Sequence, residues 1–135
     1  MSDLQKKFDH FINIVNELRS ENGCPWDKKQ SPSSLKRYLL EETNELLEAI
    51  DTGNQQHIKE ELGDLLYLIV LLSQIHNEQG FFAIEDVVEA ISAKMIRRHP
   101  HVFNNEKIES TEELRKKWLE IKEQEKSGCI HAKKN

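Results

Sequence analysis

Apolar residues recur at helical spacing along most of the chain, and no stretch alternates apolar and polar positions as a half-buried strand would. This pattern predicts helices over residues 4–20, 31–50, 55–79, 84–98 and 111–126. The segments 21–30 and 99–103 interrupt the pattern and are predicted to be loops, the second because Pro100 disfavours a helical conformation at His99. We therefore expect an all-α fold, a bundle of about five helices.

The stretch Leu65–Leu72 is apolar at all eight positions, so this part of the third helix is apolar around its whole circumference. Such a helix has to be buried on every side, which one chain of 135 residues can hardly achieve. We expect a dimer or tetramer, and the alternative is a central helix in a compact monomer. A single domain over residues 1–126 is predicted, with residues 127–135 as a flexible tail.

The composition narrows the class of protein further. The longest apolar run has eight residues, too short to cross a bilayer, and the N-terminus has no apolar signal segment. Two cysteines more than a hundred positions apart form neither a disulfide framework nor a zinc pattern, so we expect a cytoplasmic protein. The net charge of −5 argues against a nucleic-acid-binding module.

Negative charge is concentrated in residues 41–64, which carry eight acidic residues and one lysine. Glu42 and Glu45 are spaced i, i+3 and share a face of the second predicted helix, as Glu61 and Asp64 do on the third. Both pairs continue apolar stripes, where a carboxylate is costly unless a cation accompanies it. The short turn between the two helices makes them antiparallel neighbours, so the pairs can converge.

Four carboxylates suit a hard cation such as Mg²⁺, with Mn²⁺ as an alternative. A di-iron bundle would need Glu-x-x-His motifs, and none of the six histidines has a glutamate three positions before it. The competing interpretation is that these residues are ordinary solvated acids on amphipathic helices.

The acidic motif Glu41-Glu42-x-x-Glu45 followed by Glu61-x-x-Asp64 resembles the signature of the MazG-type nucleotide pyrophosphohydrolases, in the all-α NTP pyrophosphohydrolase superfamily. The resemblance extends over about residues 4–126 and includes three further segments in the family's order: Gly23-Cys-Pro-Trp-Asp27, Tyr38-Leu-Leu-Glu-Glu42 and Arg97-Arg-His-Pro-His-Val-Phe103.

The resemblance implies hydrolysis of ribo- or deoxynucleoside triphosphates at the α–β bond, giving the monophosphate and pyrophosphate with Mg²⁺, as in cleaning of nucleotide pools. It assigns Glu42, Glu45, Glu61 and Asp64 as Mg²⁺ ligands. Either Glu45 or Glu41 then orients or deprotonates the attacking water.

Basic residues on both sides of the acidic block are the candidates for substrate binding. Lys94, Arg97 and Arg98 end the fourth predicted helix and, by the resemblance, hold phosphate oxygens. The alternative is that they interact only with the helix dipole. Lys28 and Lys29 are weaker phosphate candidates, and Trp26 either stacks on the base or fills the edge of the core.

Two other functions also fit the sequence. One is a non-catalytic helical module that senses nucleotides or binds a partner, and the other is a narrower dUTP or dCTP pyrophosphatase of the same superfamily. The intact set of four acids favours an enzyme over the non-catalytic module. The best-known MazG proteins carry two such domains in tandem, whereas this chain carries one.

Overall fold

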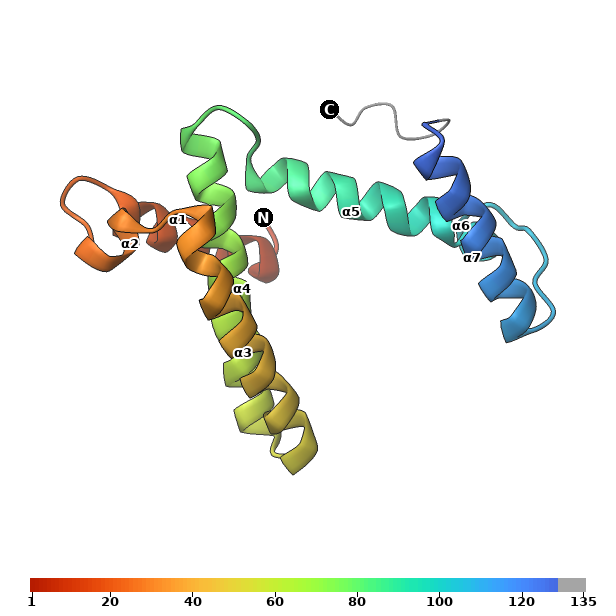
Figure 1. The fold of residues 1–135 in the computed structure, drawn as a ribbon, viewed down its shortest axis with the longest axis horizontal. Coiled ribbons are helices and arrows are strands. Elements are labelled where there is room, and N and C mark those ends of the chain that lie inside the picture. The colour runs from red at the N-terminus through yellow and green to blue at the C-terminus, as the bar shows by residue number, and fades with distance from the viewer. Residues whose placement is uncertain (129–135) are drawn as a thin grey trace. The chain divides into compact units, whose positions relative to one another are not determined.

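The computed structural model describes residues 1–128, and these residues form seven helices and no strand. The helices are α1 (Asp3–Arg19), α2 (Pro25–Lys29), α3 (Pro32–Thr52), α4 (Gln55–Glu78), α5 (Ile84–Arg98), α6 (Pro100–Phe103) and α7 (Thr111–Lys126) (Figure 1). The chain divides into two compact units, Met1–Ile84 and Glu85–Asn135. The all-α prediction is confirmed, and the five long helices lie where the apolar pattern predicts them.

Helices α3 and α4 form an antiparallel hairpin that dominates the first unit (Figure 1). Gly53 ends α3 in the left-handed conformation, with φ of 72°, and the side chain of Asn54 caps α4 by accepting a hydrogen bond from the His57 amide. Helix α1 packs against α4, and Val15, Leu35 and Leu71 are fully buried between these helices. The tight turn therefore sets which residues of α3 and α4 face each other.

Two short helices occupy the segments predicted to be loops, so that part of the prediction is wrong. Pro25 and Pro100 each stand at the first position of a helix, where the missing N–H of proline costs nothing. His99 does leave the helical conformation, with φ of −126° and ψ of 57°, as expected before a proline. Each proline thus begins a short helix.

The expectation that the apolar helix is buried on every side is only partly met within the described chain. Leu68, Val70 and Leu71 of α4 are buried, but Leu66 and Ile69 are each 40% exposed. Six large apolar residues of the hairpin stay exposed, here called the exposed hairpin residues: Leu40, Leu47, Ile50, Leu62, Leu66 and Ile69. On α4 they recur at i, i+4 and i+7, so they share one face of that helix.

In the second unit, Glu125 of α7 accepts hydrogen bonds from Arg97 at 2.6 Å and from Arg98 at 2.8 Å. Both arginines end α5, so these ion pairs hold the end of α5 to α7. None of the residues of α5 is buried. Across the described residues, every helix is too short or too polar to cross a bilayer.

Two glycines provide a matched test of this fold. A methyl group at Gly23 would overlap the carbonyl oxygens of Glu17 and Leu18, whereas one at Gly63 would meet no described atom within 4 Å. We expect Gly23→Ala to lower the free energy of unfolding by about 1–3 kcal/mol. Gly63→Ala should raise it by up to about 1 kcal/mol, because alanine favours the helix.

Urea denaturation of both variants followed by circular dichroism, with metal removed, measures these changes. Destabilisation by Gly63→Ala would contradict the open surroundings of that position and would indicate close packing against another molecule there.

Candidate functional site

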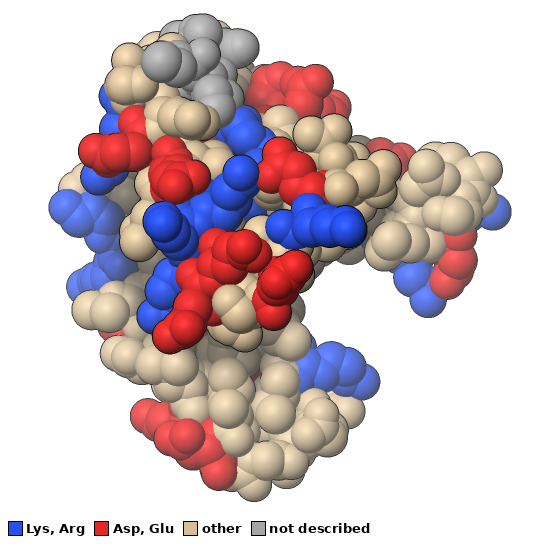
Figure 2. Space-filling view, turned by 90° about the vertical axis from the view of Figure 1, so that its right-hand side faces the viewer, with Lys and Arg blue, Asp and Glu red and all other residues tan. Residues whose placement is uncertain are grey.

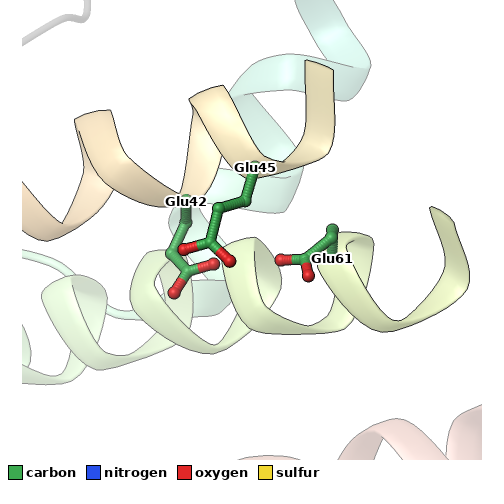
Figure 3. A group of neighbouring side chains, drawn as sticks. All are labelled: Glu42, Glu45 and Glu61. Carbon is green, nitrogen blue, oxygen red and sulfur yellow. The ribbon is translucent and has the colours of Figure 1, made fainter. Parts of the chain in front are cut away.

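The hairpin brings three of the predicted carboxylates together. Glu42 and Glu45 project from α3 toward Glu61 of α4, and one oxygen from each side chain lies within 4.8 Å of the other two (Figure 3). We call Glu42, Glu45 and Glu61 the carboxylate cluster. Glu61 is buried, Glu42 is half-buried and Glu45 is exposed, so the cluster opens from the helix interface to solvent.

Asp64, the fourth predicted ligand, is exposed one turn beyond Glu61 on α4 and lies outside the carboxylate cluster. It is nevertheless close enough for its charge to raise the pKa of Glu42. Its role as a metal ligand therefore stays a prediction. Glu41, the alternative water-activating residue, is exposed on α3, and its charge acts on the neighbouring Arg37 and Tyr38.

Burial and mutual repulsion make this cluster costly in the absence of a cation. Burial raises the pKa of Glu42 to about 7, with further contributions from the charges of Glu45 and Asp64 and from a hydrogen bond to Glu61 and the charge of that residue. One oxygen of Glu42 and one of Glu61 are buried without a hydrogen-bond partner among the described residues. A buried oxygen without a partner normally carries a desolvation penalty, which a bound cation would remove.

The donors in the cluster are all carboxylate oxygens, which fit a hard divalent cation such as Mg²⁺ or Mn²⁺. His57 lies one turn before Glu61 on α4, and its Nε2 is 3.3 Å from a carboxylate oxygen of Glu61. The sequence search for Glu-x-x-His motifs missed His57 because its partner follows it at i+4. A search for that spacing would have found the pair.

A cavity of about 730 Å³ lies at the start of α3. It is lined by Trp26, Lys29, Gln30, Ser33, Ser34, Lys36, Arg37 and Tyr38. The rings of Trp26 and Tyr38 meet edge to face, with centroids 5.2 Å apart. Tyr38, one of the lining residues, precedes Glu42 by four residues on α3, so these two side chains share a face of that helix.

The lysine predicted to bind phosphate in this region points elsewhere. Nζ of Lys28 donates a hydrogen bond of 2.7 Å to the carbonyl oxygen of Glu21, and Lys28 is not among the residues lining the cavity. The adjacent Lys29 is among them, together with Lys36 and Arg37. The sequence indicates Lys29 only as a weak candidate beside Lys28 and does not single out Lys36 or Arg37, because basic residues are common at exposed helix positions.

The remaining basic candidates lie in the second unit. Lys94 is half-buried, and Arg97 and Arg98 share the buried carboxylate of Glu125. The hydrogen bond from Arg98, together with that from Arg97 and the charges of both arginines, lowers the pKa of Glu125 to about 2 despite its burial. The two guanidinium groups are therefore oriented, and each keeps part of its donor capacity.

Acidic and basic side chains are interspersed over the face shown in Figure 2.

The comparison with protein families decides what this helical chain is. A family model described as the MazG nucleotide pyrophosphohydrolase domain matches residues 30–103, more than half of the chain. The chain belongs to the MazG family. The matched residues include the carboxylate cluster, Asp64 and the basic residues at the end of α5.

Two curated relatives and one solved structure agree with this assignment. The chain is 50% identical over 119 residues to the nucleoside triphosphate pyrophosphohydrolase/pyrophosphatase MazG of Thermotoga maritima, covering 88% of this chain and 45% of the relative. It is 42% identical over 122 residues to the nucleoside triphosphate pyrophosphohydrolase of Escherichia coli K12, covering 90% and 46%. The chain thus spans less than half the length of these relatives.

The crystal structure of a mazG-related protein from Thermotoga maritima superposes on this MazG chain with a TM-score of 0.70 and 31% identity. The match covers 85% of this chain and 98% of that protein.

The raised pKa of Glu42 predicts how stability depends on pH. Without metal, folded Glu42 keeps its proton up to about pH 7, whereas an unperturbed carboxyl loses it near pH 4.5. Between these values the folded state binds more protons, so the free energy of unfolding should fall as the pH rises. Glu42→Gln should remove this contribution, whereas Glu48→Gln, at an exposed position of the same helix, should keep it.

Added Mg²⁺ should act in the opposite direction, because a cation binds only the deprotonated carboxylate. Thermal unfolding across about pH 5 to 8, with and without Mg²⁺, measures both effects. Equal Mg²⁺-dependent stabilisation of wild type and Glu42→Gln would exclude Glu42 as a ligand.

Proposed function

We propose that this chain hydrolyses nucleoside triphosphates at the α–β bond, releasing the monophosphate and pyrophosphate, in a reaction that requires Mg²⁺. Its role would be to remove unwanted nucleotides from the nucleotide pool. The observation that supports this proposal best is the carboxylate cluster, whose buried oxygens on Glu42 and Glu61 have no partner among residues 1–128, in a chain of the MazG family. The names of the two relatives support the same class of substrate.

Glu42, Glu45 and Glu61 would hold the cation, with Asp64 completing the set from the next turn of α4. Once bound, the cation supplies charge stabilisation for the transferring phosphoryl group and a water of lowered pKa. Glu45 and Glu41 are both exposed on α3, so either carboxylate can accept the proton of the attacking water.

Different residues would bind the nucleoside and the phosphates of the substrate. The cavity beside Trp26 has a volume suited to a nucleoside, and its aromatic rings offer a surface for the base. Lys94, Arg97 and Arg98 would bind phosphate oxygens, since guanidinium groups match them bidentately. Lys28 could bind a phosphate only if its ammonium group gave up its hydrogen bond to the carbonyl oxygen of Glu21.

Self-association into a dimer or tetramer is part of the same proposal. The exposed hairpin residues leave apolar side chains in water on both helices that carry the carboxylate cluster. A second copy that covered them would bury the α4 face that this chain leaves open.

Glu61→Gln should lower kcat/KM for triphosphates by roughly 100-fold or more, because it removes a ligand and a charge from the cluster. The assay measures pyrophosphate and monophosphate released from a panel of ribo- and deoxynucleoside triphosphates with Mg²⁺, and EDTA should abolish release.

Glu48→Gln serves as the matched control, since Glu48 lies on α3 outside the cluster and is exposed. A folded wild-type protein that turned over no triphosphate in the panel would refute the proposed activity on these substrates. Turnover of dUTP or dCTP alone would identify the narrower enzyme.

The oligomer is tested by replacing two exposed hairpin residues together, Leu66→Lys with Ile69→Lys. We expect the wild type to have a mass in solution that is a multiple of 15.8 kDa, and the double variant to dissociate, because two lysines would be buried in the interface. Light scattering after size exclusion measures this. Leu119→Lys, 61% exposed on α7, is the control, and a monomeric wild type at micromolar concentration would contradict the expectation.

A further inference from the structure

Helix α2 carries Trp26, but its five residues make it too short to be stable on its own. Within the described part of the chain, no side chain caps its N-terminus at Cys24. At its other end, the last carbonyl groups of any helix lack partners within the helix. The position of Trp26 therefore depends on groups outside α2 that bind this short segment.

Arg19, in the last turn of α1, supplies partners for that end of α2. One terminal nitrogen of its guanidinium group donates to the carbonyl oxygens of Asp27 at 2.7 Å, Lys28 at 3.2 Å and Gln30 at 3.2 Å. A cation placed against the carbonyl end of a helix also interacts favourably with its dipole.

The rest of the guanidinium group binds Glu78, the last residue of α4. Nε donates to one carboxylate oxygen at 3.1 Å, and the other terminal nitrogen donates to the second at 2.5 Å. The Arg19 side chain is only 11% exposed, whereas the Glu78 side chain is 37% exposed. This one side chain connects the ends of α1, α2 and α4.

The other anchors of α2 lead directly to the cavity. The Gln30 side chain donates to the carbonyl oxygen of Trp26 at 2.9 Å and accepts from Ser34 of α3. Asp27 is 4% exposed and accepts a hydrogen bond from Tyr67 of α4. These contacts orient α2, while Arg19 donates hydrogen bonds to the carbonyl oxygens at its C-terminal end.

We infer that Arg19 is a positioning residue that fixes α2, and through it holds the Trp26 ring at the cavity where the nucleobase binds. This inference rests on the proposed function for its substrate. It adds a residue that does not itself line the cavity. Trp26 meets Tyr38 edge to face, so a loosened α2 would weaken the aromatic surface offered to the base.

The first test compares steady-state kinetics of the wild type with Arg19→Lys. Lysine keeps the charge but lacks the fork needed to bind three carbonyl groups and Glu78 together. We expect KM for the triphosphate to rise about tenfold, the order of one lost base–aromatic stack, with kcat little changed. Arg115→Lys, an exposed arginine of α7, should leave both constants unchanged.

A double-mutant cycle shows whether Arg19 acts through Trp26. If it does, adding Arg19→Lys to Trp26→Ala should raise KM no further than Trp26→Ala alone. Glu78→Gln is a milder companion to Arg19→Lys: it keeps the bonds to α2, weakens the ion pair and should raise KM less. It keeps the test informative if Arg19→Lys folds poorly by circular dichroism.

A readout independent of activity uses fluorescence. The chain has two tryptophans, so Trp118→Phe leaves Trp26 as the only one. In this background Arg19→Lys should increase the quenching of Trp26 by acrylamide, because a loosened α2 exposes the ring. Greater quenching in a protein that hydrolyses no triphosphate would support the positioning of Trp26 while refuting the proposed function.

Three results would overturn the inference. They are unchanged KM and quenching in both Arg19→Lys and Glu78→Gln, a loss confined to kcat, and effects of Arg19→Lys and Trp26→Ala that multiply in the double variant.

Discussion

Glu42, Glu45 and Glu61 repel one another across the α3–α4 hairpin, and the rest of the first unit has to hold them together against that repulsion. The apolar contacts of Leu35 and Leu71 along the same helices supply the opposing free energy. The turn at Gly53 sets the register in which the carboxylates meet. The constraints that bring the three carboxylates together thus lie in the hairpin itself.

The parts of this arrangement that depend on local spacing could be predicted from the sequence. The i, i+3 pairs, the apolar stripes and the short turn together predict convergence, and the structure brings three of the four acids together. Pro25 and Pro100 were misread as loop residues, because a proline can also stand at the first position of a helix.

Contacts between residues distant in the sequence could not be predicted. Arg19 and Glu78 are 59 positions apart, and Arg98 and Glu125 are 27 apart, so no periodicity links them. For the arginines of α5 the sequence offered a choice between a phosphate and the helix dipole. The structure adds a third partner, a buried carboxylate, which orients the guanidinium groups and still leaves donors for an anion.

The alternative of ordinary solvated acids does not account for position 42. An apolar side chain there would continue the stripe between Leu39 and Leu46 and would relieve the repulsion from Glu45, Asp64 and Glu61. Glu42 and Glu61 instead place carboxylate oxygens in buried positions without a partner among the described residues. A solvated acid has water as its partner and carries no such penalty, whereas a cation ligand is expected to lack a partner until the cation binds. A cation bound here would recover that stability as binding free energy and would couple the folding of this unit to metal binding.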